Sequence, residues 1–437
     1  MKMLQFGKII FLFFVVQLNG QDIPTLPRSL GDFAFPLPAF MEIFEDEDPS
    51  MGSIEKQTLY VSTFNPAAFY KTDPVYYLRA PGLYLNNVSS WELVELDNSA
   101  YWPNNPDILP SSVVGFEGVV WTSGFLVPSK TDGKLQLYNR HDFSAPAINI
   151  ASADPYHFSY HRVIWKDMDG DGDLDALTAR FHNADQEQQL AWLENPGAAV
   201  EGWNQHVLVT MGPDVHFRTL ELTSNGVTYD CILGGEFWQQ KVTLYFIDKS
   251  APGGWNDPLN IQSIIIDDTC GQVFDVYVDD FNRDGKIEFL ATAYNTSIKV
   301  GSVYVYEIPD SFPEGSWNRI TIADGFEPNY IFGGQSMSPG SPKPFYPSLA
   351  YENEILDDGR QHKPWLTVSG DDDGKVYILR PLSEDPTDWT YEKQILVDTQ
   401  ATTSGKMAIA DLDGDGYREI VAAGYSADRI YVFTYAP

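Results

Sequence analysis

Three short segments of the chain repeat one spacing of oxygen-bearing side chains. In residues 167–175, 280–288 and 411–419, Asp or Asn occupies positions one, three and five, Gly occupies position six, and a carboxylate occupies position nine. Ca²⁺ takes six to eight oxygen ligands, and a tight turn with this spacing can wrap such an ion. The Gly permits the sharp turn, and a divalent ion would offset the repulsion among the carboxylates. The spacing therefore predicts up to three structural Ca²⁺ ions.

Each loop offers four side chains and one backbone carbonyl as ligands. The predicted side-chain ligands are Asp167, Asp169, Asp171 and Asp175 in the first loop, Asp280, Asn282, Asp284 and Glu288 in the second, and Asp411, Asp413, Asp415 and Glu419 in the third. The predicted carbonyl ligands belong to Asp173, Lys286 and Tyr417. Only the second loop has a neutral amide among these side chains, so we expect it to bind calcium most weakly.

The sequence around the loops indicates strands and not helices. An EF-hand needs Glu at its twelfth position and a helix on each side, but the twelfth residues here are Thr178, Ala291 and Ala422. The flanking residues are apolar and partly β-branched, which is typical of buried strands. The loops resemble those of the FG-GAP/VCBS family of β-propeller repeats, whose hairpins carry the pattern D-x-D-x-D-G-x-x-D/E. The resemblance implies a propeller in which the ions brace hairpins and are not catalytic.

A recurring tryptophan sets the phase of the repeats. Apolar strands follow Trp91, Trp203, Trp255, Trp317 and Trp389, and a further strand lies between each loop or turn and the Trp. Each repeat therefore offers about four short strands, which is the composition of a propeller blade. We expect these tryptophans to pack between strands and not to bind a ligand.

Seven repeats fit the chain, at residues 54–98, 108–153, 158–212, 215–268, 272–324, 340–398 and 402–437. The last repeat lacks its Trp-led strand, which a segment between Phe33 and Phe44 would supply. The expected fold is thus all-β, a single propeller of seven four-stranded blades with calcium loops in three of them. Residues 54–437 form the propeller, and residues 21–53 form an N-terminal extension that closes the last blade.

The start of the chain indicates export. Lys2 and Lys8 precede an apolar run at residues 9–16 that is too short to cross a bilayer, so residues 1–20 are predicted to be a signal peptide. The protein is then secreted and extracellular, where calcium is abundant enough for weak sites. In an oxidising compartment Cys231 and Cys270 are expected to form a disulfide, the alternative being two buried free thiols. The triplets at Asn87 and Asn295 fit the glycosylation acceptor pattern.

Charge limits the classes of partner. The formal net charge of −33 argues against nucleic acid and against anionic membrane surfaces. It suits cationic partners, divalent ions or a calcium mineral, or simply confers solubility. No other stretch is long and apolar enough to be a transmembrane segment.

The sequence constrains the function of the protein less than it constrains the fold. His157, His161 and His182 lie near one another in the sequence and suggest a transition-metal site or a general base, the alternative being ordinary surface or hydrogen-bonded histidines. No standard hydrolase, metalloprotease or phosphate-binding motif is present. The preferred hypothesis is a secreted module that binds a protein or glycan, or an acidic matrix component. The alternative is a carbohydrate-active enzyme of the lyase or dehydratase type with its site on one face of the propeller.

Overall fold

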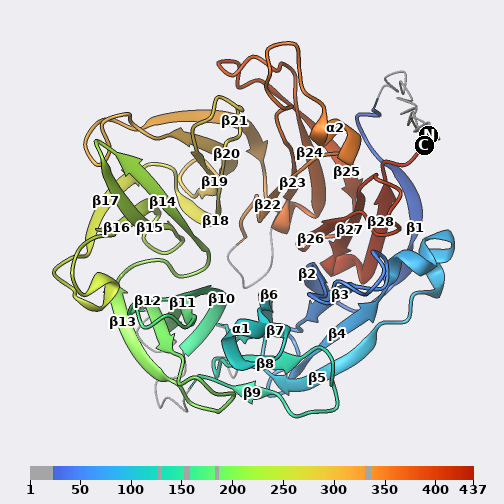
Figure 1. The fold of residues 1–437 in the computed structure, drawn as a ribbon. Helices are drawn as coiled ribbons and strands as arrows, with labels where there is room; N and C mark the ends of the chain where they lie inside the picture. The colour runs from blue at the N-terminus through green and yellow to red at the C-terminus, as the bar shows by residue number, and fades with distance from the viewer. Residues whose placement is uncertain (1–22, 126, 128–129, 152–157, 183–186, 330–335) are drawn as a thin grey trace, which may run out of the picture.

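The chain folds into a ring of seven antiparallel sheets, as Figure 1 shows for a computed structural model of the protein. The structure describes residues 23–125, 127, 130–151, 158–182, 187–329 and 336–437. Within these residues each sheet has four strands, and the strands of a sheet follow one another in sequence except in the last blade. The predicted fold class, a seven-bladed β-propeller, is confirmed.

The strands of each blade run outward from the centre of the ring in chain order. Blades one to three contain β2 (Pro38–Glu45), β3 (Gln57–Thr63), β4 (Asp73–Arg79) and β5 (Val94–Ala100); β6 (Pro103–Leu109), β7 (Gly118–Ser123), β8 (Leu135–Asn139) and β9 (Ile148–Asn149); and β10 (Phe158–Lys166), β11 (Asp175–His182), β12 (Gln188–Glu194) and β13 (Asn204–Thr210). Blades four and five contain β14 (Phe217–Ser224), β15 (Val227–Glu236), β16 (Lys241–Asp248) and β17 (Gln262–Asp267); and β18 (Gln272–Asp279), β19 (Glu288–Asn295), β20 (Val300–Glu307) and β21 (Asn318–Phe326). Blade six contains β22 (Pro342–Phe345), β23 (Trp365–Ser369), β24 (Lys375–Pro381) and β25 (Tyr391–Asp398).

The last blade joins the two ends of the chain. Its strands are β26 (Met407–Ala410), β27 (Glu419–Gly424), β28 (Arg429–Thr434) and β1 (Arg28–Ala34). The strand β1 pairs antiparallel with β28, from Arg28 opposite Thr434 to Ala34 opposite Arg429. The closing strand therefore lies mostly before the expected segment, whose later residues belong to β2 and open blade one instead. This pairing completes the last blade and holds the two ends of the chain in one sheet.

Helical segments are short and lie in the connections. They are η1 (Pro81–Ser90), α1 (Ser111–Val114), η2 (Gly254–Asn256), α2 (Leu349–Asn353), η3 (Asp371–Asp373) and η4 (Tyr425–Ala427). Among the described residues, none of the helices has the length and apolar character needed to cross a membrane.

The core lies between neighbouring blades. The second strands β3, β11, β19 and β27 are buried along nearly their whole length, because another sheet covers each of their faces. The recurring tryptophans pack in the interblade clusters, as expected: Trp91 lies with residues of blade seven, Trp203 with blade two and Trp255 with blade three. Each of these side chains therefore helps to fix one blade against the preceding one.

The two cysteines do not form the predicted disulfide. Cys231 and Cys270 are free and fully buried in one core cluster between blades four and five. The Cys270 thiol contacts the carbonyl oxygens of Asp267 and Gly271 at 3.8 and 3.6 Å. Burial raises the pKa of both thiols to about 12, which keeps them protonated and unreactive.

Candidate metal centres

The three acidic loops occupy the same place in three different blades. They connect β10 to β11, β18 to β19 and β26 to β27, so each turns the innermost strand of a blade into its second strand. Because the innermost strands run in the same sense through the ring, all three loops lie on one face of the molecule. We call this the acidic-loop face.

The first carboxylate of each loop shapes the turn in the same way. It accepts a hydrogen bond from the N–H of the sixth-position glycine: Asp167 from Gly172 at 3.2 Å, Asp280 from Gly285 at 2.9 Å and Asp411 from Gly416 at 3.0 Å. These three glycines have φ values of 97°, 90° and 90°, a region that only glycine enters readily. The sequence spacing thus encodes a backbone geometry as well as a set of oxygen atoms.

The ninth carboxylate of each loop reaches back to the second residue. Its oxygen accepts the backbone N–H of an apolar residue: Asp175 from Met168 at 2.9 Å, Glu288 from Phe281 at 2.9 Å and Glu419 from Leu412 at 2.8 Å. The side chains of the three apolar residues are buried, each in a cluster shared with the following blade. The loops therefore stand at the junctions of blades three and four, five and six, and seven and one.

The folded loops bring the predicted acidic ligands together. Ligand oxygens lie within 4.8 Å of one another in three groups: Asp167, Asp169 and Asp175; Asp280, Asp284 and Glu288; and Asp411, Asp413 and Glu419. The other predicted side-chain ligands support the turns, since Asp171 accepts from the Asp173 N–H at 3.0 Å, Asn282 from Asp284 at 2.9 Å and Asp415 from Tyr417 at 2.8 Å. The backbone carbonyls of Asp173, Lys286 and Tyr417 stay predicted ligands.

The electrostatics of the loops fit a divalent ion. Burial raises the pKa of Asp175 to about 6, that of Glu288 to about 8 and that of Glu419 to about 7, and neighbouring carboxylates add to each rise. The Asp411 Oδ1 atom is buried and has no hydrogen-bond partner. An unsatisfied acceptor and several carboxylates around one point are a donor set suited to Ca²⁺. The residues that would hold the ion are those of the three groups above.

The second loop differs from the others by a nearby cation. The Arg283 guanidinium donates to the Asp280 carbonyl at 2.5 Å and pairs with Asp279 at 3.1 Å. Its positive charge would repel a metal ion. The neutral side chain of Asn282 would also attract the ion less strongly than a carboxylate does. Both features favour the prediction that this loop binds calcium most weakly.

Contacts from the following blade hold each loop from outside. The Gln57 side chain of blade one donates to the Asp411 carbonyl at 2.7 Å, and Arg360 of blade six lies 3.5 Å from the Asn282 carbonyl. Beside the first loop, Lys166 pairs with Asp230 of blade four at 2.8 Å. Order in a loop is thereby coupled to the position of the next blade.

A fourth acidic group, which the sequence analysis missed, is an ion-pair cluster. Asp46, Glu117 and His141 come within 4.8 Å of one another. Arg140 lies among them, with its Nη1 atom 2.7 Å from Glu117 and its Nε atom 3.4 Å from Asp46. The buried guanidinium already supplies the positive charge that a metal would supply, so this cluster links blades one and two as a salt bridge.

Of the three histidines considered as a metal or catalytic cluster, the structure describes His161 and His182, and both pack against aromatic rings. His157 lies outside the described residues. His161 is buried against two phenylalanine rings, and burial lowers its pKa to about 3, so the ring is neutral. His182 contacts a third ring, that of Phe158, with 5.5 Å between centroids. Among the described residues, no group of three potential metal ligands contains His161 or His182.

The two predicted glycosylation sites differ in exposure. Asn87 is exposed in η1, and its Oδ1 accepts the Ser89 hydroxyl at 2.7 Å. Asn295 is partly buried at the end of β19, where its Oδ1 accepts the Ser297 N–H at 3.0 Å. Both stay predictions, with Asn87 the more accessible acceptor.

Charged residues facing the centre of the ring also escaped the sequence analysis, although a signal was present. Arg162, Asp275 and Lys406 each stand five positions before the first Asp of a loop. In β10 and β18 a β-bulge falls just before this residue. Equivalent positions in the repeat therefore carry charge at the ring centre, which a comparison of the three repeats in register would have found.

Comparison with known proteins gives no family. No family model matches the chain, and no curated protein matches it. Similar solved structures include the Dos1 propeller (8% identity, TM-score 0.42, covering 87% of this chain and 76% of the other) and Drosophila Plexin A in complex with Semaphorin 1b (9%, 0.43, 93% and 87%). A third is Penicillium chrysogenum α-L-arabinanase complexed with arabinobiose (12%, 0.41, 93% and 98%). The resemblance to FG-GAP/VCBS repeats thus depends on the three loops.

Proposed function

We propose that this protein is a secreted calcium-binding β-propeller that acts as a binding module for an extracellular protein or glycan. In this proposal the ions brace the ring and take no part in catalysis. One observation carries it: three loops with the same carboxylate geometry stand at three junctions between blades. Carboxylates gathered at such junctions repel one another, so a bound cation would convert a destabilising contact into a stabilising one.

The position of the third loop gives calcium a part in ring closure. Its Leu412 side chain packs with residues of blade one, and its Asp411 carbonyl accepts from Gln57. The last blade is also the one that holds the N-terminal strand β1. An ion in this loop would therefore stabilise the junction at which the two ends of the chain meet.

Calcium binding is tested by titrating metal-free protein and by thermal melting. We expect three ions per chain and a melting temperature that falls when a chelator is added. Magnesium should restore less stability, because it demands octahedral geometry and gives up water reluctantly. A Glu201→Gln variant, which changes an exposed acid outside the loops, should behave like the wild type. A melting temperature unaffected by chelator would overturn the proposal.

The binding role is tested on calcium-loaded protein. Glycan-array binding, or capture of a defined extracellular protein, would support a recognition module. Adsorption to a calcium mineral that persists at high salt would indicate a matrix component instead. Binding in neither assay, with a glycan panel that includes acidic sugars, would contradict the recognition role.

A second candidate is a carbohydrate-active enzyme, and one observation favours it. Glu42 and Asp107 line the same central cavity, and their surroundings move their pKa values in opposite directions. Carboxyl groups that differ in this way are suited to the roles of base and acid. Turnover of an oligosaccharide with one or two acidic groups that Asp107→Asn abolishes would support an enzyme, and a turnover that survives this substitution would exclude this site.

A further inference from the structure

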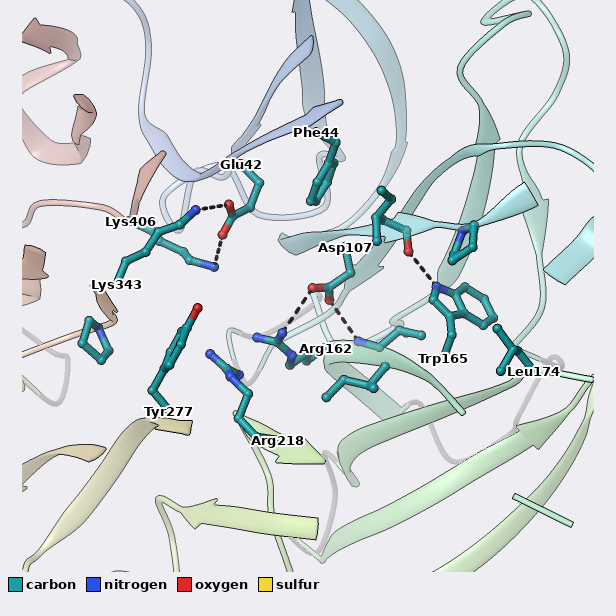
Figure 2. A pocket seen from close by; sticks show the side chains of 15 residues that line it. Glu42, Phe44, Asp107, Arg162, Trp165, Leu174, Arg218, Tyr277, Lys343 and Lys406 are labelled. Atoms are coloured by element: carbon teal, nitrogen blue, oxygen red, sulfur yellow. Dashed lines mark hydrogen bonds and ion pairs between the residues drawn. The ribbon is translucent and has the colours of Figure 1, made fainter. Parts of the chain in front are cut away.

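The centre of the ring contains a cavity of about 450 Å³, a volume within the usual range for ligand sites. Figure 2 shows the side chains that face it. The charged and phenolic groups among them are Glu42, Asp107, Arg162, Arg218, Tyr277, Lys343 and Lys406. They come from the innermost strands β2, β6, β10, β14, β18 and β22 and from the residue just before β26. Every blade thus contributes to one site.

The cavity carries a surplus of positive charge in a strongly acidic protein. Four of the groups are cationic, and only Glu42 and Asp107 are acidic. The buried Asp275, which is 3.3 Å from Arg218, adds one more negative charge. Four positive and three negative charges leave a net charge of +1, whereas the whole chain carries −33.

The ion pairs on the lysine side of the cavity are shorter than those on the arginine side, although two lysines share one carboxylate and two arginines have two. Glu42 pairs with Lys343 and with Lys406 at 2.6 Å each. In contrast, Arg162 lies 3.8 Å from Asp107, and the other Asp107 oxygen accepts the Val163 N–H at 3.1 Å. The unused donor capacity is therefore concentrated at the arginines.

Two observations at the arginines point to an anion-binding site. The Nε atom of Arg162 is buried and has no hydrogen-bond partner, and a buried unsatisfied donor is costly. Figure 2 shows Arg162, Arg218 and Tyr277 directed toward a common space. Burial lowers the pKa of Arg218, and repulsion from Arg162 lowers it further. An oxyanion in this space would relieve both the unsatisfied donor and the repulsion.

We propose that the central cavity binds a small organic anion whose carboxylate or sulfate group lies between Arg162 and Arg218. Guanidinium groups present planar forks of donors that match such oxyanions. The aromatic rings of Trp165 and Tyr277 in the same cavity suit a ligand with a ring, such as an acidic monosaccharide. The negative field of the whole protein disfavours polyanions, which limits the ligand to one or two charges. The inference supplies a ligand class for the proposed binding module.

The test is calorimetric titration of calcium-loaded and metal-free protein with glucuronate, inorganic sulfate and neutral glucose. We expect glucuronate to bind and glucose not to bind. Arg162→Gln and Arg218→Gln should each weaken glucuronate binding about ten- to a hundredfold, the range for a charged hydrogen bond. Arg380→Gln is the matched control, since Arg380 pairs with Glu392 on the outer part of blade six, and it should leave binding unchanged.

Each outcome decides the matter. Absence of glucuronate binding, or equal binding by the two arginine variants and the wild type, would overturn the proposal. Binding of sulfate without glucuronate would replace the organic ligand with an inorganic oxyanion. Arg162→Lys keeps the charge and loses the fork, so it should bind glucuronate with intermediate affinity and serves if the glutamine variant does not fold. Glucuronate binding to a protein that takes up no calcium would contradict only the proposed role of the ions.

Discussion

Replacing Glu419 with glutamine should change stability in opposite directions with and without calcium. Glu419 is buried in the third loop, where its oxygens accept the Leu412 N–H at 2.8 Å and the Thr434 hydroxyl at 2.6 Å. Glutamine can keep both contacts, because its oxygen can accept from Leu412 and its amide can donate to the Thr434 oxygen. The substitution therefore removes mainly the charge.

The magnitude follows from the pKa of Glu419. Burial raises this pKa from 4.5 to about 7, and Asp413 and Asp415 add to the rise. Because the folded state holds the proton more tightly, ionisation destabilises metal-free protein increasingly as pH rises from 4.5 to about 7, and fully above that. The difference between 4.5 and about 7, at 1.36 kcal/mol per pH unit, corresponds to about 3 kcal/mol. Glu419→Gln should thus stabilise chelated protein by up to about 3 kcal/mol at pH 8, and by less than about 1 kcal/mol at pH 5.

Calcium should reverse the sign, since the variant loses a charged ligand of the third site. The assay is urea denaturation of wild type and variant at pH 8, in chelator and in millimolar calcium. The variant should be the more stable protein in chelator and the less stable one in calcium. If it is destabilised equally in both conditions, Glu419 acts only as a hydrogen-bond acceptor, and the reasoning from an ion fails.

Three further predictions concern other parts of the molecule. Asn282→Asp should raise the calcium affinity of the second loop, and a calcium titration that leaves the weakest site unchanged would contradict the assigned order. Burial alone would raise the pKa of Glu42, but its two lysine partners hold it at about 2, so its contribution to stability is present above pH 4.5 and is lost as pH falls through about 2. Glu42→Gln leaves these lysines without a counter-charge and should lower the free energy of unfolding by about 3 kcal/mol in urea denaturation at pH 7; a loss below about 1 kcal/mol would show that other groups neutralise them. In the absence of reductant, iodoacetamide should label Cys231 and Cys270 in unfolded protein but not in folded protein. Cysteines that stay unlabelled in unfolded protein would indicate a disulfide.

The sequence predicted the blades because local patterns repeat in it. The loop spacing marks the turn between the first two strands of a blade, and the recurring tryptophan marks the start of the fourth. Both are local signals that survive without knowledge of the ring. The closing strand is harder to place, because β1 pairs with β28 across nearly the whole chain and has no loop or tryptophan of its own.

The disulfide and the central cavity depend on distances in space. Two cysteines in a secreted chain favour a bridge, but sequence does not show that the Cys270 thiol has carbonyl oxygens of its own turn as neighbours. Likewise, in the sequence Arg162 and Arg218 look like ordinary polar positions of strands in which polar and apolar residues alternate. Only the folded ring, in which the seven innermost strands converge, brings them together. Aligning the repeats by their loops would have located some of the charged residues of the cavity, but not the sign of its net charge.

Hydrogen exchange measured with and without calcium tests the central claim most directly. If ions brace the junctions between blades, calcium should slow exchange at the loop amides of Gly172, Gly285 and Gly416, and at strands of the blade that follows each loop. The second loop should need the highest calcium concentration. Exchange rates that are the same in calcium and in chelator at all three loops would show that no ion holds these junctions.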